Sequence, residues 1–141
     1  MALTTVNAYL NFNGNAADAI ALYERALGAQ VTFLQRFSEI PGASFDGDAG
    51  NRVMHATLAL GTGTCTVMIS DTMPGSTVTR GTNTHVTLQY HGTDEVDGHF
   101  AALAEGGQVT MPLENTFWGA RFGTLIDRFG ISWMVNAELP K

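Results

Sequence analysis

Cysteine, basic residues and long apolar runs are all scarce in this chain of 141 residues. The single cysteine, Cys65, cannot form an intramolecular disulfide or a cysteine-rich zinc site, so nothing in the sequence calls for an oxidising compartment. The seven lysines and arginines are scattered, and 13 acidic residues outnumber them to give a formal net charge of −6. We expect no binding to nucleic acid or to an anionic membrane surface, because both require clustered cations.

Membrane and export signals are also missing from the sequence. No apolar run approaches the roughly 20 residues that span a bilayer, and the segment MALTTVNAYL lacks the basic and apolar regions of a signal peptide. These absences predict a cytoplasmic protein. Hydrophobic residues, by contrast, make up 45% of the chain, and glycine occupies 16 positions. That composition is typical of a folded, turn-rich protein, and the length predicts a single domain over residues 1–141.

The chain contains an internal repeat. GAQVT at residues 28–32 recurs as GGQVT at residues 106–110, an offset of 106 − 28 = 78. At the same offset the segments 6–12 and 85–90 align, and both alternate apolar and polar residues as a strand with one buried face does. A helical pattern with a glycine stop follows each segment. The further strand candidates are 30–37, 53–60 and 64–70 in the first half, and 108–114, 121–127 and 131–136 in the second.

Each half therefore has a βαβββ pattern, with the first module at residues 4–71 and the second at 83–138. We predict an α+β fold in which the two tandem modules form a curved, cup-like mixed sheet with the helices outside. Residues 38–52 are expected to be a loop that could cover a site, and residues 71–83 a linker. The side chains that strand parity directs into the cup are Asn7, Tyr9, Asn11, His55, Thr57, Met68, Ser70, His85, Thr87, Gln89, Phe122, Thr124, Ser132, Met134 and Asn136.

The duplicated plan resembles a known superfamily. Together with the segments YLNFNGNAADAIALYERALGA, VMHATL and FWGARFGTLIDRFGISWMVN, it is similar to the vicinal oxygen chelate proteins, which include glyoxalases, bleomycin-resistance proteins and extradiol dioxygenases. Within that superfamily the segments resemble the PhnB-like branch, and the resemblance covers nearly the whole chain. It implies a small-molecule ligand and a homodimer that covers the edge strands. The activity stays open, because this superfamily includes lyases, dioxygenases, transferases and pure binding proteins.

The resemblance also indicates where a metal would bind. Metal-dependent members take four ligands, usually His and Glu, from the first and last strands of the two modules. Those positions correspond here to Asn7, Met68, His85 and Met134, of which only His85 is a good ligand for zinc, manganese, iron or nickel. We therefore expect no cofactor and no divalent metal site. The alternative, one divalent ion in a partial site rebuilt with His55, stays open.

These observations favour a small-molecule-binding protein, with a metal-dependent lyase or dioxygenase as the alternative. The catalytic candidates are His55 and His85, and each could equally be a structural histidine. A methyltransferase is disfavoured, because NGN at residues 13–15 replaces a glycine-rich loop after the first strand and no doubly wound sheet follows. The substrate-binding candidates are Asn7, Tyr9, Thr57, Met68, Gln89, Trp118, Phe122 and Met134.

The remaining chemically active side chains have simpler interpretations. We expect His91 and His99 to be solvated on a turn and a helix face, and Cys65 to be a buried, inert thiol. Arg121 is expected to form an ordinary ion pair, and Asp127 to be a hairpin residue. The substrate and the pathway cannot be inferred from these residues.

Overall fold

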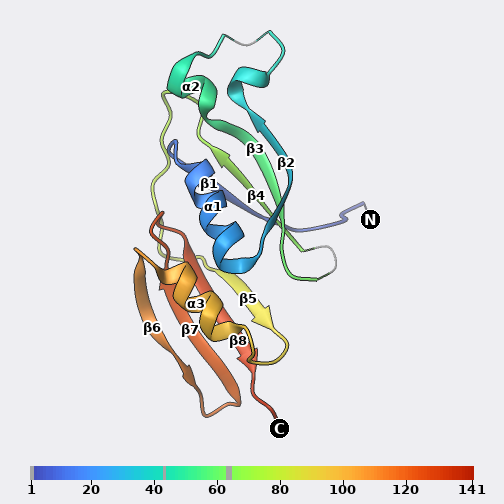
Figure 1. The fold of residues 1–141 in the computed structure, drawn as a ribbon, viewed down its shortest axis with the longest axis vertical. Helices are drawn as coiled ribbons and strands as arrows, with labels where there is room; N and C mark the ends of the chain where they lie inside the picture. The colour runs from blue at the N-terminus through green and yellow to red at the C-terminus, as the bar shows by residue number, and fades with distance from the viewer. Residues whose placement is uncertain (1, 43, 63–64) are drawn as a thin grey trace. The chain divides into compact units, whose positions relative to one another are not determined.

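The computed structural model describes residues 2–42, 44–62 and 65–141. The chain divides into two compact units, which we call unit 1 (residues up to 24, and 28–78) and unit 2 (residues 25–27 and 79–141). Each unit contains one four-stranded sheet (Figure 1). Within the described ranges, no helix combines the length and the apolar character needed to cross a membrane.

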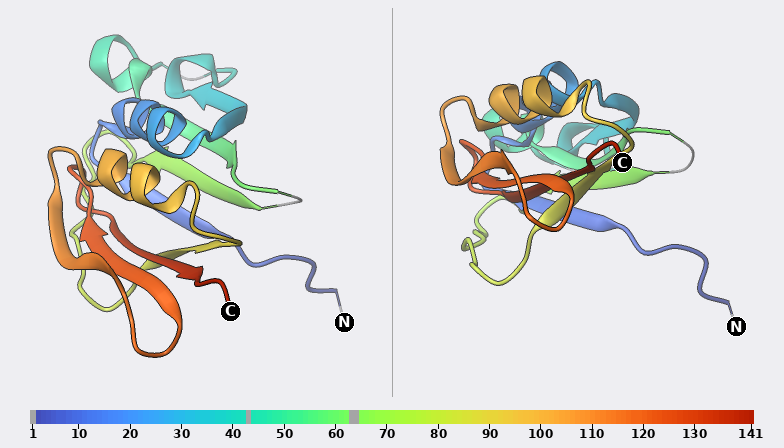
Figure 2. Two further views of the ribbon diagram at one scale, coloured as in Figure 1. Left: turned by 60° about the horizontal axis from the view of Figure 1, so that its bottom comes forward. Right: turned by 90° about the horizontal axis from the view of Figure 1, so that it is seen from below.

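The sheet of unit 1 has the strand order β1-β4-β3-β2. Strand β1 runs parallel to β4, whereas the β4–β3 and β3–β2 pairs are antiparallel. Helix α1 follows β1 and lies over one face of this sheet (Figure 2). The elements are β1 (Ala8–Phe12), α1 (Ala16–Leu27), β2 (Gln30–Arg36), a 3-10 helix (Phe37–Glu39), α2 (Gly47–Asn51), β3 (Val53–Ala59) and β4 (Thr66–Asp71).

The sheet of unit 2 repeats this topology with the order β5-β8-β7-β6. Again the first strand is parallel to the last, and the other pairs are antiparallel. The predicted tandem βαβββ pattern of an α+β fold is therefore confirmed. The elements are β5 (Val86–Tyr90), α3 (Val96–Ala104), β6 (Gln108–Asn115), β7 (Ala120–Ile126) and β8 (Ser132–Glu138).

Apolar periodicity explains which face of each element is buried. Leu10 and Phe12 alternate with exposed neighbours along β1 and are buried, as a strand with one covered face requires. Helix α1 buries Tyr23 among its apolar side chains and ends at Gly28, whose φ of 69° is left-handed and suits glycine. The prediction was wrong at Val6, which is 86% exposed because β1 begins only at Ala8.

Helix α3 packs on its sheet through a close backbone approach. Its apolar residues Val96, Phe100 and Leu103 are all buried. A Cβ added at Gly123 of β7 would lie 2.9 Å from the Cα of Leu113 and 3.0 Å from Cε2 of Phe100. Glycine at this position therefore lets the helix and strand β6 approach β7.

The segment 38–52, expected to be a loop, contains part of the 3-10 helix and all of α2. Its glycines have poor helix propensity, so the local sequence does not indicate a helix. The rings of Phe37 and Phe45 pack edge to face at 5.3 Å, and a Cβ at buried Gly50 would lie 2.6 Å from the Phe45 carbonyl oxygen. Tertiary packing thus stabilises a helix that propensity alone does not predict.

The predicted linker 71–83 also differs from the expectation at its start. Asp71 is the last residue of β4, not part of a loop. Further along, the Asn13 side chain clamps Val78: its Nδ2 donates to the Val78 carbonyl at 3.0 Å, and its Oδ1 accepts from the Val78 N–H at 2.8 Å. Residues up to Val78 are therefore held on unit 1.

Candidate functional site

One face of the unit 1 sheet carries aromatic and polar side chains. Strand alternation directs Leu10 and Ile69 to the buried face, so their sequence neighbours point to the opposite one. The register places Met68 between Tyr9 and Thr57, in one row across three strands. None of the side chains on this face carries a fixed charge. We call this the unit 1 open face; it comprises Tyr9, Asn11, Phe33, Gln35, His55, Thr57, Met68 and Ser70, of which Ser70 is buried.

His55 lies at the centre of a hydrogen-bonded chain on this face. Its Nδ1 is 3.0 Å from the Tyr9 hydroxyl, and its Nε2 is 3.2 Å from the Thr57 hydroxyl. The rings of Tyr9 and Phe33 lie 5.6 Å and 5.9 Å from the imidazole. Because a hydroxyl can donate or accept, the chain satisfies His55 in either neutral tautomer and in the protonated form. The arrangement therefore fixes the position of an imidazole beside two exposed aromatic rings.

Asn7, one of the positions where the resemblance maps a metal ligand, is already bonded. Its Nδ2 donates to the Thr66 hydroxyl at 2.6 Å, and its Oδ1 accepts from the Thr5 hydroxyl at 3.1 Å. Both ends of the amide are thus already bonded, the Nδ2 to Thr66 of β4 and the Oδ1 to Thr5 in the same segment. The other mapped position in this unit, Met68, has only a thioether, which is a poor donor for a hard divalent ion.

The sheet of unit 2 has a corresponding face, which we call the unit 2 open face. Met134 lies between Thr87 and Thr124, as Met68 lies next to Thr57 in unit 1. In the next row Asn136 lies between Gln89 and Phe122, and the amides of Gln89 and Asn136 are hydrogen-bonded at 2.9 Å. The members of this face are Thr87, Gln89, Phe122, Thr124, Met134 and Asn136, of which Thr124 is buried.

The predicted site residues therefore fall into two groups. Strand parity correctly grouped Tyr9, His55, Thr57 and Met68, which the unit 1 open face brings together. His85, the remaining mapped metal position, is exposed one residue before β5. The other candidates belong to unit 2: they are Gln89, Trp118, Phe122 and Met134.

The donors present do not match a hard divalent ion. Across the described ranges, no three side chains of His, Cys, Asp or Glu gather as a metal would need. The mapped positions supply a bonded amide and a thioether in unit 1, and a histidine and a thioether in unit 2. Zinc, manganese and iron sites use imidazole, carboxylate or thiolate ligands instead.

Asp71 is a residue that the sequence did not single out. It is buried, and its Oδ1 accepts hydrogen bonds from the backbone N–H groups of Gly14 and Ala16 at 2.8 and 2.9 Å. Its Oδ2 accepts from the Val53 N–H at 2.9 Å. Asp71, rather than Asn15, therefore caps α1, since Asn15 makes no side-chain capping bond. The signal was a carboxylate that comes two residues after the apolar run VMI.

The expectations for His99 and Cys65 were wrong. His99 is half-buried, and its Nδ1 lies 2.8 Å from the hydroxyl of Tyr90, whose side chain packs on α3. Burial, with a smaller contribution from the charge of Glu95, raises the pKa of Tyr90 to about 12. Cys65 is exposed, because it lies outside β4, which begins at Thr66.

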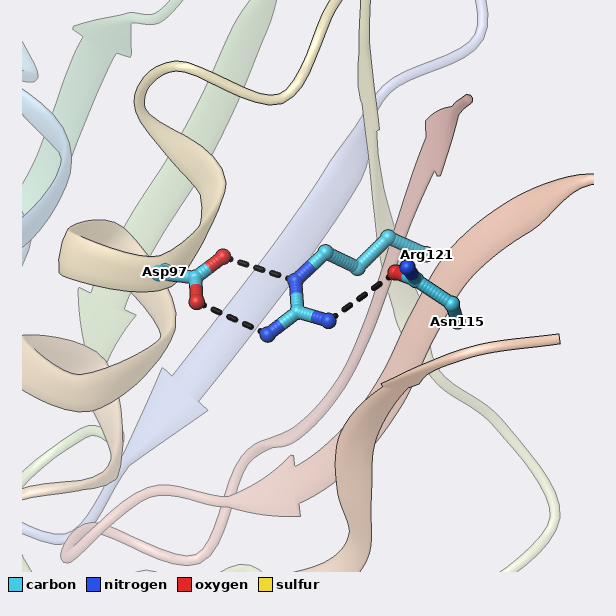
Figure 3. A network of polar contacts seen from close by, with 3 residues as sticks. All are labelled: Asp97, Asn115 and Arg121. Atoms are coloured by element: carbon cyan, nitrogen blue, oxygen red, sulfur yellow. Dashed lines mark hydrogen bonds and ion pairs between the residues drawn. The ribbon is translucent and has the colours of Figure 1, made fainter. Parts of the chain in front are cut away.

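Arg121 and Asp127 have the structural roles that were expected. Figure 3 shows the Arg121 guanidinium in a two-pronged contact with Asp97, both distances being 2.8 Å, and a third bond to Asn115. This hydrogen-bonded pairing lowers the pKa of Asp97 and raises that of Arg121. Asp127 accepts from the N–H of Phe129 at 2.8 Å, as a hairpin residue does.

Comparisons with known proteins agree with this architecture. The model of the Glyoxalase/Bleomycin resistance protein/Dioxygenase superfamily matches residues 5–135. Protein YjdN of Escherichia coli is 33% identical over 137 residues, which cover 91% of each chain. The crystal structure of protein PA1353 from Pseudomonas aeruginosa is 36% identical with a TM-score of 0.84, covering 98% of this chain and 100% of that one. With most of its length matched in this way, the chain belongs to the Glyoxalase/Bleomycin resistance protein/Dioxygenase superfamily.

Proposed function

We propose that this protein binds a small organic molecule on the unit 1 open face and does so without a divalent metal ion. The observation that carries the proposal is the Tyr9–His55–Thr57 chain on a face whose side chains have no fixed charge. Tyr9 and Phe33 are 43% and 49% exposed, so their rings are accessible to a ligand. Aromatic contact area combined with a few fixed polar groups is what small-molecule sites use.

The second part of the proposal concerns the metal. A metal ion on His55 would have to displace Tyr9 or Thr57, because both ring nitrogens already have partners. We expect protein purified without chelator to contain far less than one equivalent of any transition metal by elemental analysis. Treatment with a chelator should leave its melting temperature unchanged. Stoichiometric metal would overturn this part and favour a metal-dependent lyase or dioxygenase.

The binding part is tested by a ligand screen with matched variants. We expect neutral aromatic compounds to shift NMR resonances of Tyr9 and His55, and the His55→Gln variant to weaken that binding. His91→Gln is the matched control, because His91 is exposed on a turn of unit 2. A separate His85→Ala variant tests the remaining histidine candidate. Equal affinities for the His55→Gln and His91→Gln variants would contradict the proposed site.

We also propose that the functional form is a homodimer. Strands β2 and β6 are edge strands of their sheets. They expose apolar side chains at Val31, Val109 and Met111. An exposed edge with apolar side chains favours pairing with another chain.

A further inference from the structure

The unit 2 open face has a fixed hydrogen-bonding edge. The Nδ2 of Asn136 donates to the Oε1 of Gln89 at 2.9 Å, and the two residues are register partners on parallel strands. This bond uses one donor and one acceptor of the pair. Gln89 keeps its Nε2 hydrogens, and Asn136 keeps its Oδ1. The pair therefore presents an amide donor and an amide acceptor, which the mutual bond holds in fixed relative positions.

An aromatic series lies beside this amide pair. Phe122 is the register partner of Asn136 on β7, and its ring is 6.0 Å from that of Trp118. Trp118 in turn packs edge to face on Phe117 at 5.0 Å. Trp118 is 57% exposed although it is a large apolar side chain. Rings exposed to this extent next to fixed polar groups are typical of surfaces that receive a planar ligand.

The surrounding charges disfavour an anionic ligand. Glu114 of β6 is the register partner of Phe122 and adds a carboxylate at this edge. The nearest cation on the strand, Arg121, is already bonded to Asp97 and Asn115. A carboxylate or phosphate ligand would therefore meet repulsion without a free cation to balance it.

From these contacts we infer that the unit 2 open face binds a planar aromatic amide or lactam. Its carbonyl accepts from the Nε2 of Gln89, its N–H donates to the Oδ1 of Asn136, and its ring packs against Phe122 and Trp118. This inference rests on the proposed function, since it names the chemistry of a second contact surface for a small-molecule ligand. It has its own probes and its own variants, so it can fail while the proposed function stands.

The test is an NMR titration with three probes that separate the interactions. Benzamide has the ring, the donor and the acceptor; N,N-dimethylbenzamide lacks the donor; cyclohexanecarboxamide lacks the aromatic ring. The readouts are the side-chain amide resonances of Gln89 and Asn136 and the indole resonance of Trp118. We expect benzamide to shift the resonances of all three side chains. It should bind about two- to tenfold more tightly than either of the other probes, because one hydrogen bond or ring contact contributes a difference of this size.

Matched variants assign the interaction to the amide pair. Gln89→Met and Asn136→Leu should each weaken benzamide binding about two- to tenfold. N,N-dimethylbenzamide keeps its carbonyl but has no N–H, so Gln89→Met should weaken its binding as well, whereas Asn136→Leu should leave it nearly unchanged. Gln108→Met is the control, because Gln108 is an exposed glutamine at the start of β6. Gln89 is itself exposed, so its variant keeps the test valid if Asn136→Leu fails to fold.

Three outcomes would overturn the inference. Equal affinities for benzamide and N,N-dimethylbenzamide in the wild-type protein would show that the amide pair does not recognise the ligand. Shifts confined to Tyr9 and His55 would place the ligand in unit 1 alone, which would leave the proposed function intact. A complete absence of shifts with all three probes would also reject the inference, and the wider screen on His55 would then decide the proposed function separately.

Discussion

Two buried carboxylates show how single residues hold this fold together. Asp71 joins the start of α1 to strand β3 through three backbone N–H groups. Asp127, which is 2% exposed, accepts from the N–H groups of Phe129 and Ile131 and from the indole N–H of Trp133. A buried carboxylate is stable only when its oxygens are satisfied in this way. Both aspartates are therefore structural rather than catalytic.

The Asp127→Asn substitution tests this interpretation. An amide keeps one acceptor oxygen but turns an NH₂ group toward the N–H donors, so at least one buried donor loses its partner. We expect the free energy of unfolding to fall by about 1–3 kcal/mol. Urea denaturation followed by the fluorescence of buried Trp133 measures the loss. The control is Asp48→Asn at an exposed position, and equal stabilities for the two variants would contradict the role assigned to Asp127.

The ionisation of Tyr90 predicts how stability changes in alkali. Burial raises the pKa of Tyr90 from 10.0 to about 12, so the folded state favours the neutral phenol. This contribution to stability is complete below the unfolded pKa and is lost as the pH rises from about 10 through about 12. We expect Tyr90→Phe to reduce the slope of unfolding free energy against pH in that window. An unchanged slope would show that the ionisation of Tyr90 does not contribute to the pH dependence of stability in this window.

At the scale of single residues, the sequence correctly predicted which side chains share a face of a sheet, because strand alternation decides this. His55 and Thr57 share a face because they lie two residues apart in β3, and Tyr9 of β1 lies on the same face because both it and Thr57 are register partners of Met68. Asp71 and the Tyr90–His99 pair were missed, because their roles depend on contacts between elements distant in sequence or between a strand and a helix. Periodicity carries no information about such contacts.

At the scale of elements, two glycines of unit 2 have different roles, one in α3 and one in the strand on which α3 packs. Gly123 of β7 is buried where Leu113 and Phe100 leave no room for a side chain. Gly98 lies within α3, and a Cβ there would meet open space. The sequence indicates glycine at both positions but not which one is needed, because only the packing between elements distinguishes them.

The two alanine variants should therefore change stability in opposite directions. We expect Gly123→Ala to destabilise unit 2 by about 1–3 kcal/mol through overpacking. Gly98→Ala should stabilise it by about 0.5–1 kcal/mol, because alanine has the higher helix propensity. Thermal and urea unfolding of both proteins supply the comparison. A stable Gly123→Ala protein would mean that β6 and α3 can move apart at little cost.

At the scale of the whole molecule, the internal repeat was the decisive signal in the sequence. The shared QVT motif predicted two modules, and both sheets have the same topology. The repeat also retains a threonine–methionine pair at matching positions, Thr57–Met68 and Thr124–Met134. The short helix α2 was not predicted, because it occurs in one module alone and has no counterpart to reveal it.

The proposed homodimer gives a prediction at the same scale. Light scattering coupled to size-exclusion chromatography should give twice the chain mass of 15.0 kDa at micromolar concentration. Replacing Val109 and Met111 on edge strand β6 by lysine should shift the protein toward the monomer, because edge lysines oppose strand pairing. A monomeric wild-type protein would refute the proposal.

The two hydrogen bonds between Asn13 and Val78 determine where the chain can be shortened without losing contacts of unit 1. A fragment ending at residue 71 would discard Val78 and leave the Asn13 amide without either partner. One that ends after residue 78 retains both bonds and contains all of unit 1 together with residues 25–27 of unit 2. A division of the chain that keeps these two bonds therefore falls between Val78 and Thr79.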